Sequence, residues 1–267
     1  MTRLVVNIGN RMVVPTTSRA SFASFWTPTE ITTAAWYDAS DANTISESGG
    51  DVSQWSDKSG NDNHATQGTI AYKPTYSSTG WDGSLSSIDF TITGSDGNEL
   101  ESPTANGFTD TEYVYFIMTE PLSRVSQTRH LAFVLLGGGD QACYNKASGG
   151  IQGMGTYAAG YVGEVPERPI RKQMLTYDYS SGGEFYRDGD SVFSGAWTPS
   201  SFLPTYFQIG HSGGSRYDGK MSEIIIMNKS DCNNATRQKV EGYLAWKWGL
   251  ESELPIGHPY KNSRPVS

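Results

Sequence analysis

The 267-residue sequence is poor in cysteine, in basic clusters and in long apolar runs. Its two cysteines, Cys143 and Cys232, are too few for a disulfide framework. The sequence is compatible with two free thiols and with one long-range disulfide. No apolar run reaches the roughly 20 residues that cross a bilayer. The longest basic cluster is RPIRK at 168–172 and the formal net charge is −8, so we expect neither nucleic acid nor a membrane as a partner.

The N-terminal stretch also lacks the apolar core of a signal peptide. MTRLVVNIGNRMVVP holds two short apolar runs split by Asn7, Asn10 and Arg11, so we expect no export signal. Residues 1–30 are polar and Ser/Thr-rich around three brief apolar pieces, LVV, MVV and FASFW. Such a segment orders best on a partner surface. We therefore predict that residues 1–30 form an arm and that residues 31–267 form one domain.

Glycine, proline and aromatic residues are present in quantity. The chain has 30 Gly and 12 Pro, and Trp, Tyr and Phe make up 12% of it. Turn residues at this density separate short strands, and large aromatic side chains build a sandwich core from few positions. Apolar runs at 112–119 and 130–136 suit strands buried on both faces. We predict an all-β fold, a two-sheet antiparallel β-sandwich of the jelly-roll kind.

One helix is expected, over residues 234–248. Asn233 is a suitable N-cap because its side-chain oxygen can accept a free backbone N–H. Val240, Leu244 and Trp248 follow at i, i+4 and i+8 and form one apolar face. Gly249 then occupies the position where glycine adopts a left-handed conformation most cheaply. We expect the proline-punctuated tail after it to wrap the sandwich.

Two segments resemble a known family. Residues 36–67 contain the pattern Asp-x-Ser-Gly-Asn-x-x-His at 57–64, and residues 217–248 contain YDGKMSEIIIMN followed by the predicted helix. This order resembles the laminin-G-like jelly rolls of the concanavalin A-like lectin and glucanase superfamily, of the type found in phage virion and bacterial surface proteins. Ser222 departs from the family pattern, in which Asp often stands before the Glu of this strand. The resemblance implies a lectin-like sandwich and says little about function.

Three functions are compatible with this resemblance. The first is a non-enzymatic phage virion surface protein, a capsid decoration or a tail or fibre component that is assembled in the host cytoplasm. It would bind neighbouring virion subunits through residues 1–30 and would display the module for structure or adhesion to host glycans. The second is a glycan-binding module of a bacterial surface or secreted protein. The third is a glycan-active enzyme. We expect the first.

Signatures of catalysis are weak. GHSGG at 210–214 matches the serine-hydrolase pattern, but a strand follows it where that elbow needs a helix. Glycosidases need paired carboxylates, and the nearest pairs, Glu99 with Glu101 and Asp110 with Glu112, resemble loop charges. The four histidines lack zinc-ligand spacing. We therefore expect no enzymatic activity and no catalytic residue.

Binding candidates come from aromatic and polar residues in turn-rich segments, because sugar sites combine aromatic faces with fixed polar groups. The glycine-rich stretch 149–163 is the best candidate loop. Six ligand-binding residues are predicted: Trp81, Tyr157, Tyr161, His211, Arg216 and Tyr217.

The segment from Asp57 to Asn63 permits two interpretations. Oxygen-bearing side chains at alternate positions are typical of calcium loops, with Asp57 and Asn61 as the first ligands. The same spacing forms an Asx-rich turn that binds its own backbone. Gly68 stands where an EF-type loop needs its last carboxylate, which favours the turn, and we expect no other cofactor.

Overall fold

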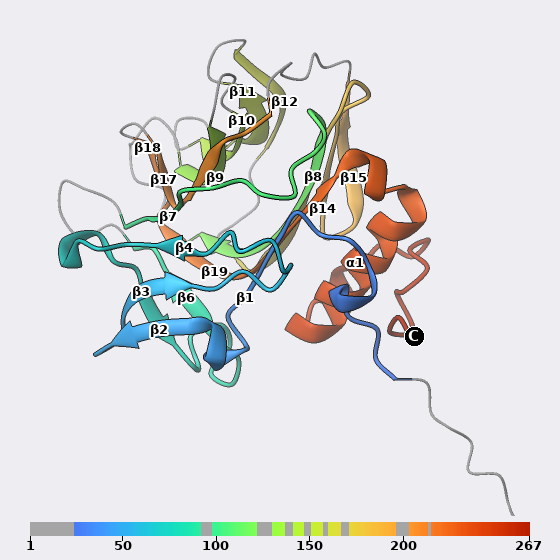
Figure 1. The fold of residues 1–267 in the computed structure, drawn as a ribbon. Coiled ribbons are helices and arrows are strands. Elements are labelled where there is room, and N and C mark those ends of the chain that lie inside the picture. The colour runs from blue at the N-terminus through green and yellow to red at the C-terminus, as the bar shows by residue number, and fades with distance from the viewer. Residues whose placement is uncertain are drawn as a thin grey trace, which may run out of the picture.

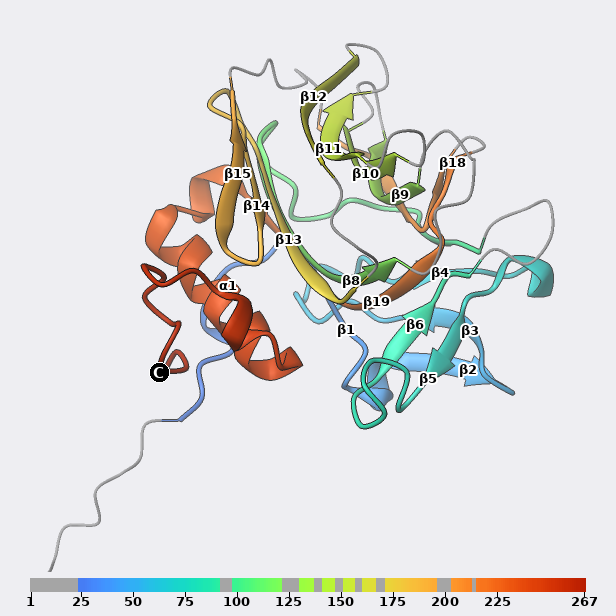
Figure 2. The ribbon, with the colours of Figure 1, turned by 180° about the vertical axis from the view of Figure 1, so that it is seen from behind.

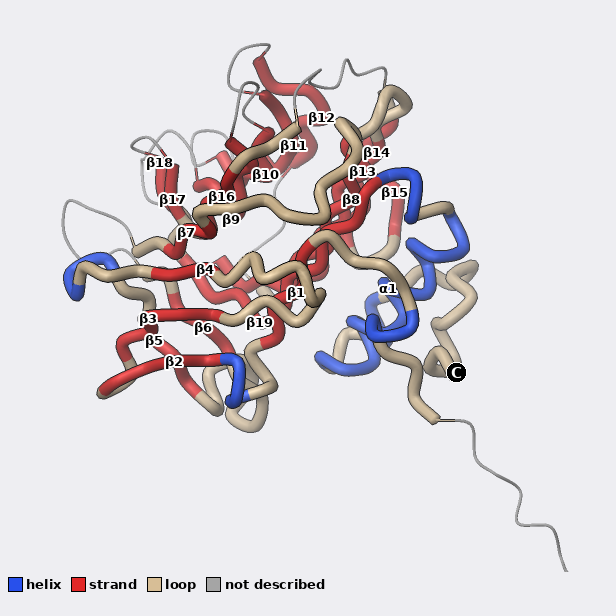
Figure 3. The backbone as a smooth tube through the Cα atoms, in the orientation of Figure 1, coloured by secondary structure: helices blue, strands red, loops and turns tan. Residues whose placement is uncertain are grey.

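The computed structural model describes residues 24–91, 98–121, 130–136, 141–146, 151–156, 160–166, 171–195, 203–212 and 215–267. In these residues strands and loops dominate, and one α-helix, α1 (Asn234–Trp248), is present, as Figure 3 shows. Single 3-10 turns occur at η1 (Pro28–Glu30), η2 (Ala42–Thr44), η3 (Ile70–Tyr72), η4 (Lys229–Asp231) and η5 (Glu251–Glu253). No helix in this part of the chain has the length and apolar character needed to span a bilayer.

The first layer of the sandwich is an antiparallel sheet in the order β1, β19, β8, β13, β14, β15. Its strands are β1 (Ala35–Asp38), β8 (Tyr113–Pro121), β13 (Gln173–Tyr179), β14 (Glu184–Arg187), β15 (Asp190–Ser194) and β19 (Gly219–Asn228). The central strands β8 and β19 are buried on both faces, as the apolar run at 112–119 predicts. Alternate side chains of these strands therefore enter two different cores.

The second layer pairs nine strands in an antiparallel order that crosses the sequence several times. In spatial order they are β2 (Ile45–Ser48), β3 (Asp51–Trp55), β4 (Ala65–Thr66), β7 (Leu100–Ser102), β16 (Tyr206–Ile209), β9 (His130–Leu136), β10 (Gln141–Lys146), β11 (Ile151–Thr156) and β12 (Gly160–Pro166). Figure 2 shows β5 (Thr75–Ser77) and β6 (Ser87–Asp89) at the end of the sandwich where the layers join. There β5 pairs with β3, and β6 pairs with β19. The first strand of this link begins directly after Pro74, which has no N–H to donate to a strand partner.

The main core lies between the two layers and is rich in aromatic rings. Tyr37 of β1 contacts Trp55 of β3 and Phe207 of β16, with ring centroids 5.4 and 6.2 Å apart. Within the first layer, the rings of Tyr177 of β13 and Phe185 of β14 stack with their centroids 4.6 Å apart. All five rings are buried. These contacts confirm that few, large side chains fill the interior of this sandwich.

Helix α1 covers the outer face of the first layer, as Figure 1 shows, and makes a second core there. The two helix-capping predictions are confirmed: the Asn233 side chain accepts the Thr236 N–H, and Gly249 has a φ of 73°. Val240, Leu244 and Trp248 are all buried on this face. The arrangement is helix, sheet and sheet, so the first layer is enclosed on both sides.

The hairpin between β14 and β15 turns at Asp188 and Gly189. Asp188 and Gly189 have φ values of 54° and 81°, the left-handed conformation that a two-residue hairpin of this type requires. The turn joins β14 to β15, and on its other edge β14 pairs with β13 in a register that places Asp178 opposite Glu184. This register positions two residues of the site described below.

Part of the predicted arm belongs to the folded domain. Phe25 forms a β-bridge with Val266 near the C-terminus, and Trp26, 1% exposed, packs edge-on against Tyr243 of α1 at 5.9 Å. Figures 1 and 2 show this segment beside the helix and the C-terminal tail. The boundary placed at residue 30 therefore lies too far along the chain, because residues 24–30 fill the second core. Residues 1–23 lie outside the described residues.

Candidate functional site

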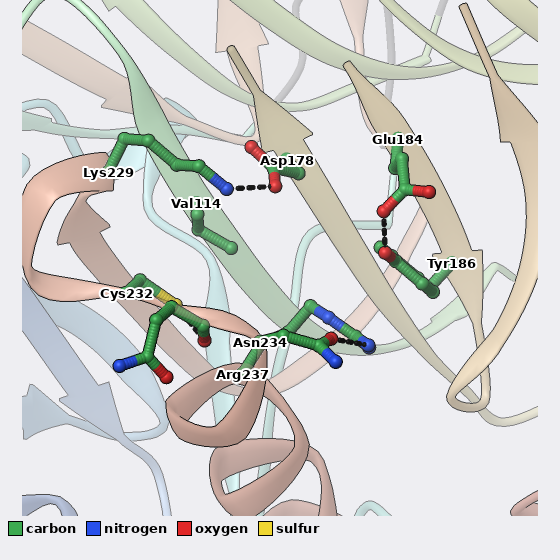
Figure 4. A pocket seen from close by; sticks show the side chains of 9 residues that line it. Val114, Asp178, Glu184, Tyr186, Lys229, Cys232, Asn234 and Arg237 are labelled. Atoms are coloured by element: carbon green, nitrogen blue, oxygen red, sulfur yellow. Dashed lines mark hydrogen bonds and ion pairs between the residues drawn. The ribbon is translucent and has the colours of Figure 1, made fainter. Parts of the chain in front are cut away.

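A cavity of about 380 Å³ opens between the first turn of α1 and the outer face of the first layer. We call it the α1 pocket, and Figure 4 shows it from close by. Nearly all of its lining residues carry a polar or charged group; the set is Val114, Asp178, Glu184, Tyr186, Lys229, Cys232, Asn233, Asn234 and Arg237. Strand alternation explains the location: Tyr177 and Tyr179 enter the main core, so Asp178 points to the opposite face.

Two carboxylates lie side by side in the α1 pocket. Asp178 of β13 and Glu184 of β14 are register partners across an antiparallel pair, where opposed Cβ atoms are about 4.5–5.5 Å apart. The Lys229 ammonium forms an ion pair with Asp178 Oδ2, and the Tyr186 hydroxyl donates to Glu184 Oε2. Asp178 Oδ1 is buried and has no hydrogen-bond partner among the described residues. The pair thus retains acceptor capacity that the protein does not use.

Arg237 forms the helix side of the pocket. Its guanidinium lies 3.8 Å from the centre of the Tyr186 ring and donates to Glu241 Oε2 and Asn234 Oδ1, both at 2.6 Å. Both side chains of the Arg237–Glu241 pair are less than a tenth exposed. Glu241 Oε2 also lies 3.3 Å from Nε2 of the buried His258. These contacts hold the guanidinium over the tyrosine ring, so this wall of the pocket is preorganised.

Cys232 brings a thiol to the pocket, but its environment opposes reactivity. Burial raises the pKa of the Cys232 thiol to about 12, and the nearby Lys229 ammonium offsets only part of this shift. The thiolate is the nucleophilic form, so the thiol is protonated and inert near neutral pH. Cys232 is a free cysteine in the structure. We assign it a packing role.

A second, more open cavity of about 430 Å³ lies at the other end of α1, above a buried ionic cluster. Phe25, Trp36, Asp38, Lys58 and Lys247 are among the residues that line this cavity. At its base, Lys247 Nζ lies 2.7 Å from both Asp38 Oδ1 and Glu223 Oε2. The charged groups of this cluster bind one another and hold the helix to the sheet.

Glu223 is the centre of that cluster and is fully buried. Its Oε1 accepts from Trp36 Nε1 at 2.8 Å and Tyr243 OH at 3.1 Å, and its Oε2 accepts from Trp248 Nε1 at 2.6 Å in addition to Lys247. Burial raises the pKa of Glu223. Burial alone would also raise the pKa of Asp38, but the ammonium groups of Lys247 and Lys58 outweigh it and lower that pKa. The glutamate of the YDGKMSEIII motif is therefore a structural anchor for the helix.

Two of the predicted sugar-binding residues, Trp81 and Tyr217, lie in the interior of the domain. Trp81 is 2% exposed and donates its indole N–H to the Trp248 carbonyl at 3.1 Å. Tyr217 is fully buried in the main core beside Thr119, and burial raises its pKa well above the usual range. Neither ring presents a face to a ligand, because both positions became core positions when the sheets paired.

The remaining sugar-binding predictions fall in segments that are described in part or not at all. Tyr157 lies outside the described residues, and Tyr161 lies in β12. His211 and Arg216 lie in β17 (His211–Ser212) and β18 (Ser215–Arg216), which form a two-stranded sheet of their own. GHSGG is therefore part of a β-hairpin, which differs from the strand-to-helix elbow of a serine nucleophile.

Asp57 and Asn61 act as anchors for the segment that precedes β1. Asp57 Oδ1 accepts from the backbone N–H groups of Trp36 and Ser59, both at 2.9 Å, and Oδ2 accepts from Ser59 Oγ and Asn63 N. Asn61 Nδ2 donates to the carbonyls of Thr33 and Ala34 at 3.0 Å. Within the described ranges no group of three His, Cys, Asp or Glu side chains could hold a metal ion. The geometry is that of the Asx-rich turn.

Removing the Asp57 carboxylate is therefore expected to destabilise the domain independently of calcium. Asp57→Ala leaves the buried backbone N–H groups of Trp36 and Asn63 without acceptors. We therefore expect the free energy of unfolding to fall by about 3 kcal/mol. Denaturant melts of wild type and variant in EDTA and in calcium should show the same difference. A bound ion at 100 times its dissociation constant would instead stabilise only the wild type, by about 2.7 kcal/mol.

Sequence reasoning missed the residues of the α1 pocket. Asp178 and Glu184 lie six residues apart, and only the hairpin register makes them neighbours. Carboxylates paired across two strands leave no signature in the spacing along one strand. A signal was present all the same: Asp178 is a charged residue in a strand that is buried along its whole length, and Arg237 lies in the first turns of the predicted helix near its apolar face.

Comparison with known proteins places the fold among parts of glycan-active enzymes. No family model and no curated protein matches the chain. Among solved structures it is similar to domain 4 of a GH43 extracellular arabinanase from Geobacillus stearothermophilus in complex with arabinotriose, with 15% identity and a TM-score of 0.55 over 74% of this chain and 93% of that one. It is also similar to a Trypanosoma rangeli sialidase in complex with sialic acid, with 14% identity and a TM-score of 0.55 over 85% of this chain.

A third similar structure is an arabinofuranosidase complexed with arabinofuranosyl-alpha-1,2-xylobiose, with 14% identity, a TM-score of 0.55 and coverage of 73% of this chain. The chain spans 36% of the sialidase and 50% of the arabinofuranosidase, but nearly all of the arabinanase domain. At these identities the likeness shows the fold alone. The fold is a jelly-roll-like β-sandwich.

These neighbours correct one expectation. The sequence led us to expect a protein without enzymatic function, yet the three neighbours named above are an arabinanase domain, a sialidase and an arabinofuranosidase. The expectation relied on carboxylate pairs that are close in the sequence, and these say nothing about pairs that a hairpin register brings together. The expectation of no enzymatic activity is therefore withdrawn.

Proposed function

We propose that this chain is a glycan-binding module that serves a glycan-active protein, with the α1 pocket as its sugar site. The observation that carries the proposal is the lining of that pocket: two adjacent carboxylates, two asparagine amides and an aromatic residue around a cavity of about 380 Å³. Ligand pockets occupy about 300–1,000 Å³, so this one accommodates a short segment of a glycan. The arabinanase domain with the same fold is described in complex with arabinotriose.

Sugar recognition depends on hydrogen bonds to hydroxyl groups that the protein holds in fixed positions. Carboxylates supply only acceptors, whereas asparagine amides supply both donors and an acceptor. In the α1 pocket both kinds are held on rigid elements, the carboxylates on β13 and β14 and the amides at the N-terminus of α1. Because these elements pack on a shared core, their spacing does not require rearrangement when a ligand binds.

The decisive experiment is a titration with short glycans, in which binding is measured by calorimetry or by protein NMR. We expect arabinotriose or another neutral oligosaccharide to bind, and we expect Glu184→Ala to weaken binding by about tenfold or more, as loss of a charged hydrogen bond does. Asp190→Ala is the matched control: it removes an acidic side chain from the same hairpin at an exposed position outside the pocket. Equal affinity of the Glu184 variant and wild type would show that sugars bind elsewhere.

Two finer predictions from the sequence remain proposals. The laminin-G-like subtype depends on the patterns at 57–64 and 217–248. Display on a phage virion surface depends on the arm predicted over residues 1–30, of which residues 1–23 lie outside the described residues. None of the neighbours named above supports the virion setting, and the extracellular arabinanase favours the glycan-binding module instead. Co-purification of this chain with phage particles would test the virion proposal directly.

A further inference from the structure

The charges around the α1 pocket are distributed unevenly. Lys229 is paired with Asp178, and Arg237 is paired with Glu241 just behind the lining. Glu184 forms no ion pair with any described residue, and its recorded partner is the neutral hydroxyl of Tyr186. Both cations of the pocket are therefore neutralised by the protein itself. One carboxylate is left over.

The N-terminus of α1 opposes this negative charge only in part. A helix end carries roughly half a positive charge, and the effect is confined to its first turn. Part of that first turn is already occupied, because the Asn233 side chain accepts the Thr236 N–H at 3.0 Å. The full charge on Glu184 is therefore larger than the partial charge that faces it. An anionic ligand group would meet net repulsion in this pocket.

The hydrogen-bonding groups of the pocket also favour a neutral ligand over an anionic one. Asp178 Oδ1 and the Glu184 carboxylate accept hydrogen bonds and cannot donate them while ionised. A hydroxyl group supplies the donor that these oxygens require, whereas a ligand carboxylate supplies only further acceptors. The guanidinium of Arg237, the natural partner of a carboxylate, lies against the Tyr186 ring and is bound on both sides by Glu241 and Asn234.

We infer that the α1 pocket selects neutral sugars and discriminates against sugar acids, with Glu184 as the residue that sets this specificity. The inference rests on the proposed glycan-binding function and narrows it to a ligand class. It predicts that two sugars of the same shape differ in affinity when one carries a carboxylate. Repulsion between like charges a few ångströms apart in partly solvated surroundings is large enough for about a tenfold difference.

Galactose and galacturonic acid, or their short oligomers, are matched probes, because they differ in the oxidation state of one carbon. Titrations at neutral pH should show at least about tenfold tighter binding of the neutral member. Glu184→Gln keeps an acceptor and the approximate side-chain volume but removes the charge, so it should bring the two affinities to within about threefold. Asp190→Asn, which removes an exposed charge from the same hairpin, should leave the discrimination unchanged.

Each outcome decides the matter. Equal or tighter binding of the acid, lost in Glu184→Ala, would overturn the selectivity and leave the glycan-binding function standing. A neutral preference that survives in Glu184→Gln would overturn the role of Glu184. Binding of neither sugar, nor of arabinotriose, would overturn the proposed function and the inference with it.

Discussion

Replacing Glu223 by leucine is expected to lower the free energy of unfolding by about 3–5 kcal/mol, as removal of one member of a buried ion pair does. The glutamate accepts four hydrogen bonds, from the indoles of Trp36 and Trp248, the Tyr243 hydroxyl and the Lys247 ammonium. Leucine has a similar volume but no acceptor, so all four donors lose a partner in an environment with little water. A thermal or denaturant melt measures the loss.

A surface ion pair provides the control. Glu253 pairs with Arg171 at 2.8 Å, and the side chains are 39% and 29% exposed. Glu253→Gln should cost less than about 1 kcal/mol, because exposed pairs are screened by solvent. If Glu223→Leu costs no more than Glu253→Gln, the buried cluster is not what attaches α1 to the sheet.

The two carboxyl groups of the cluster respond to pH with opposite signs. The pKa of Glu223 is raised by burial, so its contribution to stability is greatest below the ordinary carboxyl pKa and falls as the pH rises through the folded value. The pKa of Asp38 is lowered, chiefly because Lys247 outweighs the effect of burial, so its contribution is present above the ordinary pKa and is lost as the pH falls. Glu223→Gln should remove the first dependence and retain the second in melts across the acidic range.

Replacing Trp26 by alanine should also cost about 3–5 kcal/mol, the usual range for deletion of a large buried aromatic side chain. Trp26 is 1% exposed, contacts Tyr243 edge-on and lies under the ammonium of Lys239, 4.9 Å from the ring centre. It is held in place by backbone bonds to the C-terminal segment, including Trp26 N to Pro265 O at 3.2 Å. The variant should melt at a lower temperature but still cooperatively.

Two truncations separate this segment from the residues before it. Deletion of 1–30 removes Trp26 and the bridge between Phe25 and Val266, whereas deletion of 1–23 retains both. The difference in melting temperature between the two truncated proteins should match the effect of Trp26→Ala or exceed it. Equal melting temperatures would mean that residues 24–30 do not stabilise the domain and would restore the boundary at residue 30.

The elements that the sequence predicts well are those with local causes. The helix begins after Asn233 and ends before Gly249 because a cap and a left-handed residue act within one turn of the chain. The turn at Asp188 and Gly189 is specified in the same local way. The run at 112–119 identifies β8 as a buried strand because both faces of that strand are apolar along most of its length.

The α1 pocket could not be predicted in that way, because it results from contacts between distant residues. Asp178 and Glu184 become neighbours through strand register, and Lys229 and Arg237 reach them only after α1 packs on the sheet. Trp81 and Tyr217 were predicted to bind sugar but are buried. An aromatic side chain in a turn-rich segment can serve as a sugar platform or as part of the core, and the sequence does not distinguish the two.

The sequence by itself determined the fold class, the helix and the turns, because hydrophobic periodicity and backbone preference act over a few residues. The tertiary structure alone decided which polar residues are anchors and which line a pocket. Burial gives Glu223 four partners and makes it structural, whereas Glu184, half-buried at the edge of a cavity, keeps a charge that no described cation neutralises. That distinction depends on solvent exposure and on partners far apart in the chain, which no local pattern encodes.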